Sequence, residues 1–300
     1  MHSGKSCTAG AEPQRDTVVD LVWVILRPCR PLGNHRHVND RFTMLPSDEQ
    51  VPFCEERPPS GMFTWTRTEK MHSEGTTEAD MLAKLVGERS SCRGFLSERV
   101  PHDVITHILD IARGTPSWCN TQPWHVHITE GSETEKFRRA LRAHVGTEMS
   151  ETPDLPFPTA YEGAYRERRR ASGWQLYDSL GIAKGDREAS GRQMLKNFDL
   201  FGAPHVAIIT TDAALGLYGA VDCGLFVQSF LLAAHSLGVA TVPQAAIASQ
   251  SPFIRQYFEL PADRQVLLGI SFGYADESLP INRYRTARQS TDELVSWRSS

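Results

Sequence analysis

The sequence predicts a layered domain in which helices and strands alternate, rather than an all-α or all-β fold. Several segments carry apolar residues at the spacing of an amphipathic helix, and others are the short apolar or alternating runs typical of strands. Because the two kinds of segment take turns along the chain, a mixed fold is favoured. The 300 residues, 40% hydrophobic and 23% charged, suit one large globular domain or two small ones.

Residues 1–75 differ in composition from the rest of the chain. Prolines punctuate them and sustained apolar periodicity is missing, which seldom produces a packed core. Two interpretations stay open: a disordered extension, or a start assigned too early, with translation beginning at Met71 or nearby. A targeting peptide is not favoured, because the first nine residues lack a basic start and Asp16 and Asp20 interrupt any apolar stretch. We therefore expect the folded domain to span residues 76–300.

The first half of that domain should contain three helices and a strand. A helix is expected to begin within residues 76–80, whose acidic residues suit a first helical turn. A second helix should begin near Pro101 and end at Gly114. Residues 124–128 alternate as a strand does, and residues 133–145 return to helical spacing.

The second half should supply the remaining strands and a long helix. Residues 146–200 are polar and mostly helical in pattern, whereas residues 205–210 form a compact buried-strand candidate. Residues 239–242 and 265–274 are the other expected strands. Between the strand candidates 205–210 and 239–242, residues 216–237 predict a core helix or a helix spanning a dimer. We do not expect that helix to cross a membrane, because it contains polar residues: Asp222, Gln228 and His235.

Charge and cysteine content exclude several classes of function. The formal net charge is −4 with a pI near 6.3, so nothing favours nucleic acid or an anionic membrane as a partner. Six cysteines without CxxC pairs indicate reduced thiols and a cytoplasmic protein, and no zinc-type spacing predicts a metal. The glycine fingerprint of dinucleotide-binding folds and the serine nucleophile elbow are also missing from the sequence.

Two motifs carry the chemical information. Residues 113–124, RGTPSWCNTQPW, place main-chain amides, amide side chains and two indoles in one short link, suited to a flat ligand with polar edges. Upstream, Arg89 and Arg93 flank two serines and so combine guanidinium and hydroxyl donors, the groups that converge on a phosphate. Surface clusters of this kind are common, so the second motif gains its meaning from the first.

The link resembles the PS-x-x-N-x-QPW signature of the nitroreductase family, and the upstream cluster resembles that family's phosphate-binding opening. The resemblance covers roughly residues 80–297 and is closest to the nitrobenzoate-reductase branch. It implies an α+β fold, with a central, mostly antiparallel sheet flanked by helices. It also implies an intertwined homodimer with FMN at the interface.

The resemblance further implies which residues contact FMN. Arg89 and Ser91 should meet the phosphate, and Arg93 should lie near the flavin pyrimidine edge, where its charge stabilises the reduced flavin. Trp118 replaces a small residue found in many relatives and should line the substrate pocket. The full set of implied cofactor residues is Arg89, Ser90, Ser91, Arg93, Pro116, Ser117, Trp118, Asn120, Asn197, Pro243, Gln244, Ala245, Ala246, Arg285 and Arg288.

These residues fall into five groups along the chain, the first being the 89–93 cluster. Residues 116–120 should approach the flavin from the partner subunit, whereas the loop 243–246 should direct main-chain amides at the flavin N5 edge. Ala245 and Ala246 replace the acidic residue and glycine frequent in relatives. Arg288 should close on the phosphate, with Arg285 the weaker candidate. Asn197 should touch the ribityl or pyrimidine side.

Plainer interpretations accompany several of these residues. Trp124 is expected to be a core residue and Cys119 a small buried one, and Asn197 has the alternative of a simple turn residue. The arginine-rich run 165–170 is either a solvated helix face or a cap over the active site that attracts an anionic substrate.

The implied activity is ping-pong reduction of a nitroaromatic compound to the hydroxylamine, with NADH or NADPH as donor and no dedicated catalytic side chain. The same scaffold supports other electron-poor acceptors, through dehalogenation or through enone or quinone reduction. A non-catalytic FMN-binding protein is the third interpretation. The sequence does not choose between NADH and NADPH.

Overall fold

The computed structural model describes residues 76–147 and 151–299. The expectations for residues 1–75, including a start at Met71, lie outside these described residues.

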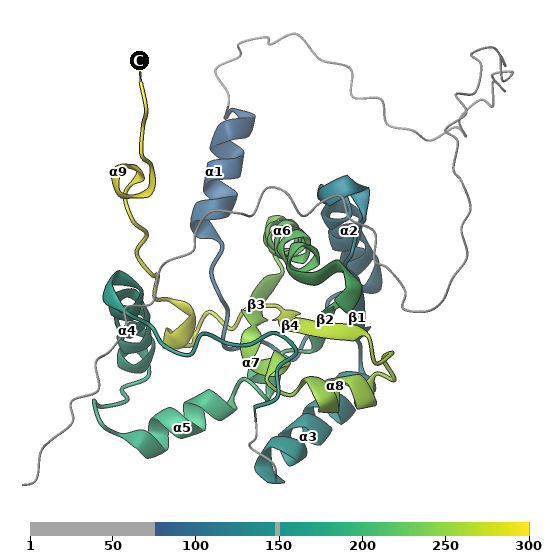
Figure 1. Cartoon of the computed structure of the whole chain (residues 1–300). Coiled ribbons are helices and arrows are strands. Elements are labelled where there is room, and N and C mark those ends of the chain that lie inside the picture. Colours follow the sequence, from purple (N-terminus) through teal and green to yellow (C-terminus); the bar gives the residue numbers. More distant parts are fainter. Residues whose placement is uncertain (1–75, 148–150, 300) are drawn as a thin grey trace, which may run out of the picture. The chain divides into compact units, whose positions relative to one another are not determined.

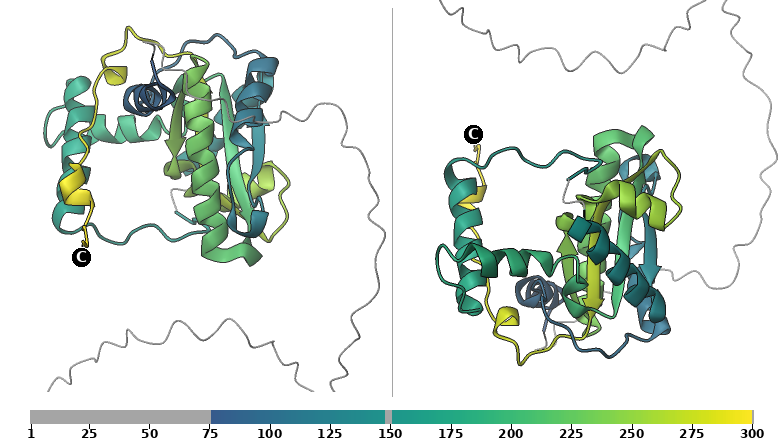
Figure 2. Two further views of the ribbon diagram at one scale, coloured as in Figure 1. Left: turned by 90° about the horizontal axis from the view of Figure 1, so that it is seen from above. Right: turned by 90° about the horizontal axis from the view of Figure 1, so that it is seen from below.

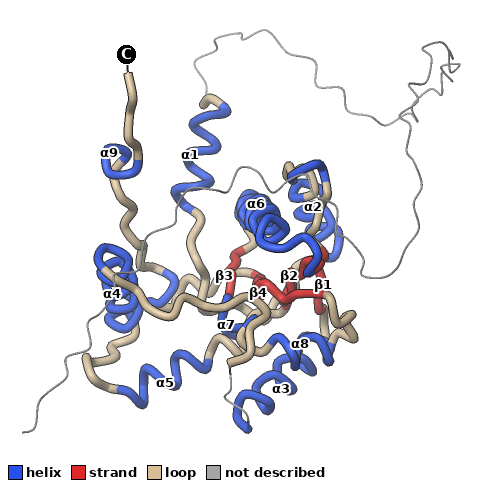
Figure 3. Tube along the Cα trace, in the orientation of Figure 1, coloured by secondary structure: helices blue, strands red, loops and turns tan. Residues whose placement is uncertain are grey.

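A four-stranded antiparallel sheet forms the centre of the domain (Figures 1 and 3). Its order is β1 (His125–Thr129), β2 (His205–Asp212), β4 (Arg264–Gly273) and β3 (Ala240–Gln244), and every neighbouring pair is antiparallel. Seven of the eight residues of β2 are buried, because this strand is covered on both faces. All four strands occur where the sequence predicts them, which confirms the α+β class.

One face of the sheet is covered by α2 (His102–Ala112) and α6 (Gly216–Ser236) (Figure 1). Ile108 of α2 and Phe230 of α6 are completely buried against Ile209 and Phe272 of the sheet. Both helices occupy the predicted segments. However, α2 is capped by Arg113 in the right-handed helical region, so Gly114 lies beyond its end and does not provide the cap.

The other face is covered by α3 (Ser132–Thr147), α7 (Ala245–Ala248) and α8 (Ser251–Tyr257). Phe137 and Ile254 are completely buried there, against Ile208 of β2. The sequence predicts α3 but not the other two helices, because four and seven residues are too few to display a 3.6-residue period.

The remaining helices lie at the margin of the domain: α1 (Glu78–Glu88), α4 (Gly163–Ser179), α5 (Arg187–Leu195) and α9 (Thr291–Leu294). Figure 2 shows α4, together with the C-terminal segment, standing away from the sheet. None of their residues is buried, although α1 has a complete capping box between Thr77 and Asp80. Packing inside a single protomer therefore does little to hold these helices.

By length and composition alone, residues Ala213–Ser236 would suffice to cross a membrane, with a mean hydropathy of 1.5 over the most apolar window. Half of that window is buried in the domain, against the sheet. The burial includes the polar residue Asp222, so α6 serves as a core helix here.

Candidate functional site

A cavity of about 380 Å³ lies between the end of α1 and the C-terminal segment. Six of the residues that the sequence predicts as cofactor contacts line it: Arg89, Ser90, Ser91, Arg93, Arg285 and Arg288. Val86, Gly87, Ser172, Tyr284 and Thr286 complete the wall. The structure thus brings together two motifs that are almost 200 residues apart in the chain. We call this space the arginine cavity.

The first wall of the arginine cavity is an extended segment attached to the edge of the sheet. Helix α1 ends at Glu88, and Arg89 caps it through a main-chain bond to Leu85. Ser91 then pairs in parallel with Thr241 of β3, and the Cys92 N–H donates to the Thr241 carbonyl at 2.9 Å. These ladder bonds fix the direction of the segment, so the neighbouring serine and arginine side chains have defined positions.

The second wall is held by Asn282. Its side-chain oxygen accepts a hydrogen bond from the Arg93 N–H at 2.7 Å, and its amide donates to the Gly94 carbonyl at 2.8 Å. The Arg93 guanidinium in turn donates to the Tyr284 hydroxyl at 2.8 Å. The glycine at position 94 allows the Leu279 side chain to approach the main chain closely, since a β-carbon there would lie 2.3 Å from that side chain. These contacts position the C-terminal arginines opposite Arg89.

The arginine cavity is strongly cationic, and no acidic side chain lines it. Burial, followed by the nearby charge of Arg288, lowers the pKa of Arg89. Within the described part of the chain, the Arg89 Nη1 atom is buried without a hydrogen-bond partner. A buried guanidinium nitrogen that lacks an acceptor and lies near a second positive charge is unfavourable unless an anion compensates both charges. The residues present therefore fit a phosphate group.

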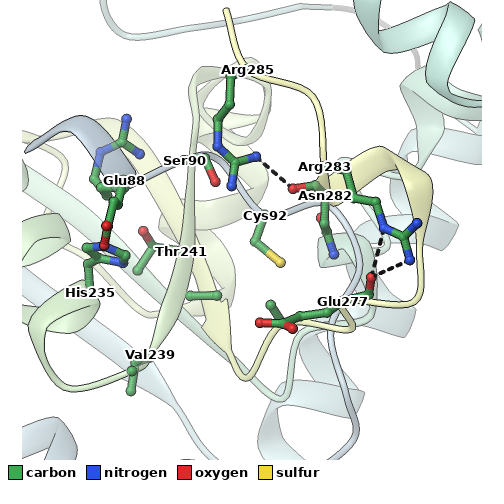
Figure 4. Close-up of a pocket in the computed structure, with 14 residues that line it drawn as sticks. Glu88, Ser90, Cys92, His235, Val239, Thr241, Glu277, Asn282, Arg283 and Arg285 are labelled. Atoms are coloured by element: carbon green, nitrogen blue, oxygen red, sulfur yellow. Dashed lines mark hydrogen bonds between the residues drawn. The ribbon is translucent and has the colours of Figure 1, made fainter. Parts of the chain in front are cut away.

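A second cavity, of about 520 Å³, adjoins the first along the 88–92 segment (Figure 4). It shares Arg89, Ser90 and Arg285 with the arginine cavity, but two carboxylates, Glu88 and Glu277, also line it, which suits a dianion less well. Burial raises the pKa of the Cys92 thiol there to about 11, and the thiol donates to the Gly94 carbonyl. Cys92 is therefore a neutral structural residue.

The PSWCN loop, residues 116–120, connects α2 to β1, and none of its residues lines the arginine cavity. Its Trp118 N–H donates to the Asp222 carboxylate of α6 at 3.0 Å. Cys119 and Asn120 both adopt positive φ, as does Gln122, whose N–H donates to the Ser117 hydroxyl at 2.9 Å. Non-glycine residues in this region are strained and persist where their surroundings hold them. The loop is thus a defined structure.

Much of this loop is exposed. The Trp118 side chain is 60% exposed and touches Tyr218 edge-to-face, with ring centroids 4.8 Å apart. Pro116 and Asn120 are exposed and Ser117 is partly so. The prediction that Cys119 is buried is wrong, because the left-handed turn leaves it exposed in the protomer. Trp124 is partly buried and stacks on Phe226 at 5.0 Å, so it packs against the core, as predicted.

Gln244 joins the sheet to the end of α5. Its amide nitrogen donates to the Asn197 carbonyl at 2.9 Å, and its oxygen accepts a hydrogen bond from the Ser271 hydroxyl. The buried Gln244 side chain is therefore occupied in bracing the structure, and any ligand contact at this position involves the main chain. Ala245 and Ala246 follow as the first turn of α7, whose amides have no acceptor within the helix. Pro243 is half-buried on the same strand that pairs with Ser91.

Three residues that shape these sites were not predicted: Asp222, Asn282 and Tyr284. An acidic residue within an apolar helix is the signal that would have pointed to Asp222, since a buried carboxylate requires a donor. The roles of Asn282 and Tyr284 depend on contacts across more than 180 residues, which spacing does not reveal. No cluster of metal-ligating side chains occurs among residues 76–147 and 151–299.

A protein-family model described as "Nitroreductase family" matches residues 86–274 of this chain. The chain is 36% identical to a 4-nitrobenzoate reductase of Pseudomonas putida over 205 residues, which cover 68% of this chain and 90% of the relative. It is 32% identical to nitroreductase NfnB of Mycolicibacterium smegmatis over 219 residues, covering 72% and 92%.

The fold is similar to a solved structure from the same family. The crystal structure of the FMN-dependent nitroreductase NfnB from Mycobacterium smegmatis in complex with NADPH aligns with a TM-score of 0.70 and 30% identity, covering 74% of this chain and 99% of that one. Together with a family match over more than half of the chain, this likeness establishes that the protein belongs to the nitroreductase family.

Proposed function

We propose that the protein is an FMN-dependent NAD(P)H oxidoreductase that reduces nitroaromatic compounds to hydroxylamines, through a domain spanning residues 76–300. The observation that carries this proposal is the arginine cavity, where the buried Nη1 of Arg89 has no partner within the described residues and Arg288 lines the same space. Relatives that are nitroreductases by name, and the FMN-dependent enzyme of similar fold, support it.

In this proposal Arg89, Ser91 and Arg288 hold the FMN phosphate, with Ser90 and Arg285 beside them. Arg93 is kept in place by Tyr284 and Asn282, and its charge lies near the flavin pyrimidine edge. When bound, FMN takes a hydride from NAD(P)H and passes electrons to the nitro group. The protein contributes binding, orientation and electrostatic stabilisation.

The other proposed contacts come from the sheet edge and from a partner. Asn197 lies beside the flavin, and Pro243, Gln244, Ala245 and Ala246 present main-chain groups at the end of β3. The PSWCN loop, with Pro116, Ser117, Trp118 and Asn120, reaches the cofactor of a second subunit. None of these loop residues lines the arginine cavity of its own protomer, which supports that arrangement.

The homodimer is part of the proposal. Leu217, Val221 and Leu225 recur every four residues along α6 and are 73%, 50% and 47% exposed. Tyr218 and Trp118 extend the same exposed apolar surface. Such a continuous stripe on an otherwise buried helix favours pairing with a second copy. A dimer would also cover α1, whose Met81, Leu82 and Val86 are exposed.

The overall reaction consumes two molecules of NAD(P)H and two protons for each nitro group, giving one hydroxylamine, one water and two NAD(P)⁺. We place the protein in the cytoplasm, where its free thiols Cys92, Cys119 and Cys223 would stay reduced.

The proposal is tested by steady-state product analysis. The full-length protein, reconstituted with FMN, should convert 4-nitrobenzoate into 4-hydroxylaminobenzoate at the expense of NADPH or NADH. The same preparation without FMN serves as the control and should be inactive. Oxidation of NAD(P)H by the FMN-loaded protein, with the nitroarene left intact, would contradict nitroreduction and point to another electron-poor acceptor.

A further inference from the structure

A groove of about 370 Å³ runs between α4 and the C-terminal segment. The residues that matter to its chemistry are Arg93, Arg169, Arg170, Trp174, Tyr177 and Tyr284. It shares Arg93, Ser172 and Tyr284 with the arginine cavity, so the two spaces adjoin. We call it the α4 groove.

The spacing of residues along α4 explains which side chains the α4 groove receives. Arg169 and Arg170 precede Trp174 and Tyr177 by four to eight positions, which places all four on one side of the helix. Ser172, Gly173, Leu176 and Tyr177 on this side are partly covered, whereas the arginines remain exposed. Arg168 does not line the groove. At about 100° per residue, it lies about 140° around the helix from the middle of the side that carries the lining residues.

The two arginines of the α4 groove are uncompensated. Among the ion pairs of the described residues, none involves Arg169 or Arg170. The Arg169 guanidinium lies 5.1 Å from the centre of the Tyr161 ring, a cation–π contact that limits its motion. The groove therefore offers two guanidinium groups with free donors.

The rest of the α4 groove is aromatic. Trp174 and Tyr177 meet edge-to-face with centroids 6.3 Å apart, and Tyr284 is held by the hydrogen bond from Arg93. Aromatic side chains offer flat surfaces for a ring, and guanidinium groups match a carboxylate with two parallel hydrogen bonds. A neutral arene would use only the first of these features.

We propose that the α4 groove recognises aromatic carboxylates, with Arg169 and Arg170 binding the carboxylate of the acceptor and the aromatic side chains binding its ring. This inference rests on the proposed function, because it names the class of nitroarene that the enzyme prefers. The groove includes Arg93, which the proposed function places near the flavin pyrimidine edge, so an acceptor anchored there lies beside the flavin ring. Arg169 and Arg170 are thus specificity-determining residues.

The test compares ligands that differ only in charge, using the FMN-loaded full-length protein and its Arg169→Gln, Arg170→Gln and Arg168→Gln variants. Calorimetry measures the binding of benzoate and benzamide, neither of which carries a nitro group. Initial rates give kcat/KM for 4-nitrobenzoate and 4-nitrobenzamide.

We expect the wild-type protein to bind benzoate more tightly than benzamide. Each groove substitution should weaken benzoate binding and lower kcat/KM for 4-nitrobenzoate by about 10-fold or more, the loss expected for a charge-assisted hydrogen bond. The affinity for benzamide and the kcat/KM for 4-nitrobenzamide should change less than about 2-fold. Arg168→Gln should behave as wild type with every ligand, and Arg170→Lys should recover part of the loss because it restores the charge.

Equal losses for the acid and the amide, or no loss with either, would overturn the inference. A rise in KM for NADPH with 4-nitrobenzoate unaffected would also overturn it and assign the groove to the dinucleotide. If the wild-type protein reduces neither nitroarene, the proposed function fails. Benzoate binding that depends on Arg169 and Arg170 would still support the groove in that case.

Discussion

The main-chain N–H of Trp118 donates a hydrogen bond to the carboxylate of Asp222, which is 6% exposed on α6, at 3.0 Å. This single contact joins the strained PSWCN loop to the helix that carries the exposed apolar stripe. No ion pair to Asp222 occurs within the described residues, so the hydrogen bond from the loop amide helps to stabilise the carboxylate. The position of the loop and the surface of α6 are therefore coupled.

Replacing Asp222 by Leu should release the loop. The Trp118 amide would lose its acceptor, at a cost of about 1–3 kcal/mol in the free energy of unfolding, and FMN should bind more weakly to the dimer. Asp222→Asn keeps an oxygen acceptor and should lose less in both measurements. Urea denaturation and FMN titration check this. Unchanged FMN affinity in Asp222→Leu would show that the PSWCN loop does not contribute to cofactor binding.

Arg89→Gln and Arg288→Gln should weaken FMN binding by about 10- to 100-fold each, the range for a charge-assisted hydrogen bond. Riboflavin lacks the phosphate, so its affinity should be nearly the same in these variants and in wild type. Fluorescence titration with both flavins measures the difference, with the exposed Arg139→Gln as the control. Parallel losses for FMN and riboflavin would show that the arginines do not act through the phosphate.

Val221→Asp places a charge in the centre of the exposed α6 stripe. It should convert the dimer to monomers at micromolar concentration and lower FMN occupancy, because an isolated protomer lacks the partner's loop. Sedimentation velocity with simultaneous flavin absorbance records both effects. Leu96→Asp, at an exposed leucine outside α6, is the matched control and should stay dimeric. If the Val221→Asp protein remains dimeric, the dimer interface lies on another surface.

Gln244→Leu removes the brace between Asn197 and Ser271. The buried Ser271 hydroxyl and the partly buried Asn197 carbonyl would lose their hydrogen bonds, so the free energy of unfolding should fall by about 2–3 kcal/mol. Amide exchange should increase at the end of α5, whereas Gln175→Leu, on the exposed side of α4, should change neither quantity. Full stability in Gln244→Leu would mean that the brace is replaceable by apolar packing.

Acid should destabilise the domain through His127. Burial, aided by the charges of His125 and Arg264, lowers its pKa to about 4. Between pH 6.5 and 4 the unfolded chain therefore binds more protons than the folded one, and stability falls as the pH falls through this window. Allowing for partial exposure, about 1–2 kcal/mol should be lost. His127→Gln should flatten the pH dependence of the unfolding free energy, whereas the exposed His107→Gln should not.

Local patterns predict most of the fold. The four strands and α2, α3 and α6 are long enough to show their periodicity, and the acidic start of α1 identifies its first turn. Short elements such as α7 and α8 are not predicted by local patterns, because their positions are set by burial of Ile247 and Ile254 against the sheet. The exposure of Cys119 was missed for a related reason, since the fold holds its backbone at positive φ against the usual preference.

The resemblance implies the cofactor motifs and places Arg89 and Arg288 on one phosphate, but the contacts that bring their segments together are not predicted. Arg89 and Arg288 share a cavity because Asn282 joins their two segments, a contact across 188–189 residues. The α4 groove combines helical spacing, which the sequence displays, with Tyr284 from a distant segment. Gln244 is predicted to meet the cofactor through its main chain, whereas the internal hydrogen bonds of its side chain depend on distant partners and are not predicted.

The most direct test of the account is an anaerobic absorbance titration of the purified full-length protein reconstituted with FMN. NADPH or NADH should bleach the flavin band in the absence of any acceptor, and one addition of 4-nitrobenzoate should restore it. That result would establish both half-reactions at one site. A protein that retains no FMN, or whose flavin band NAD(P)H leaves unchanged, would contradict the central claim.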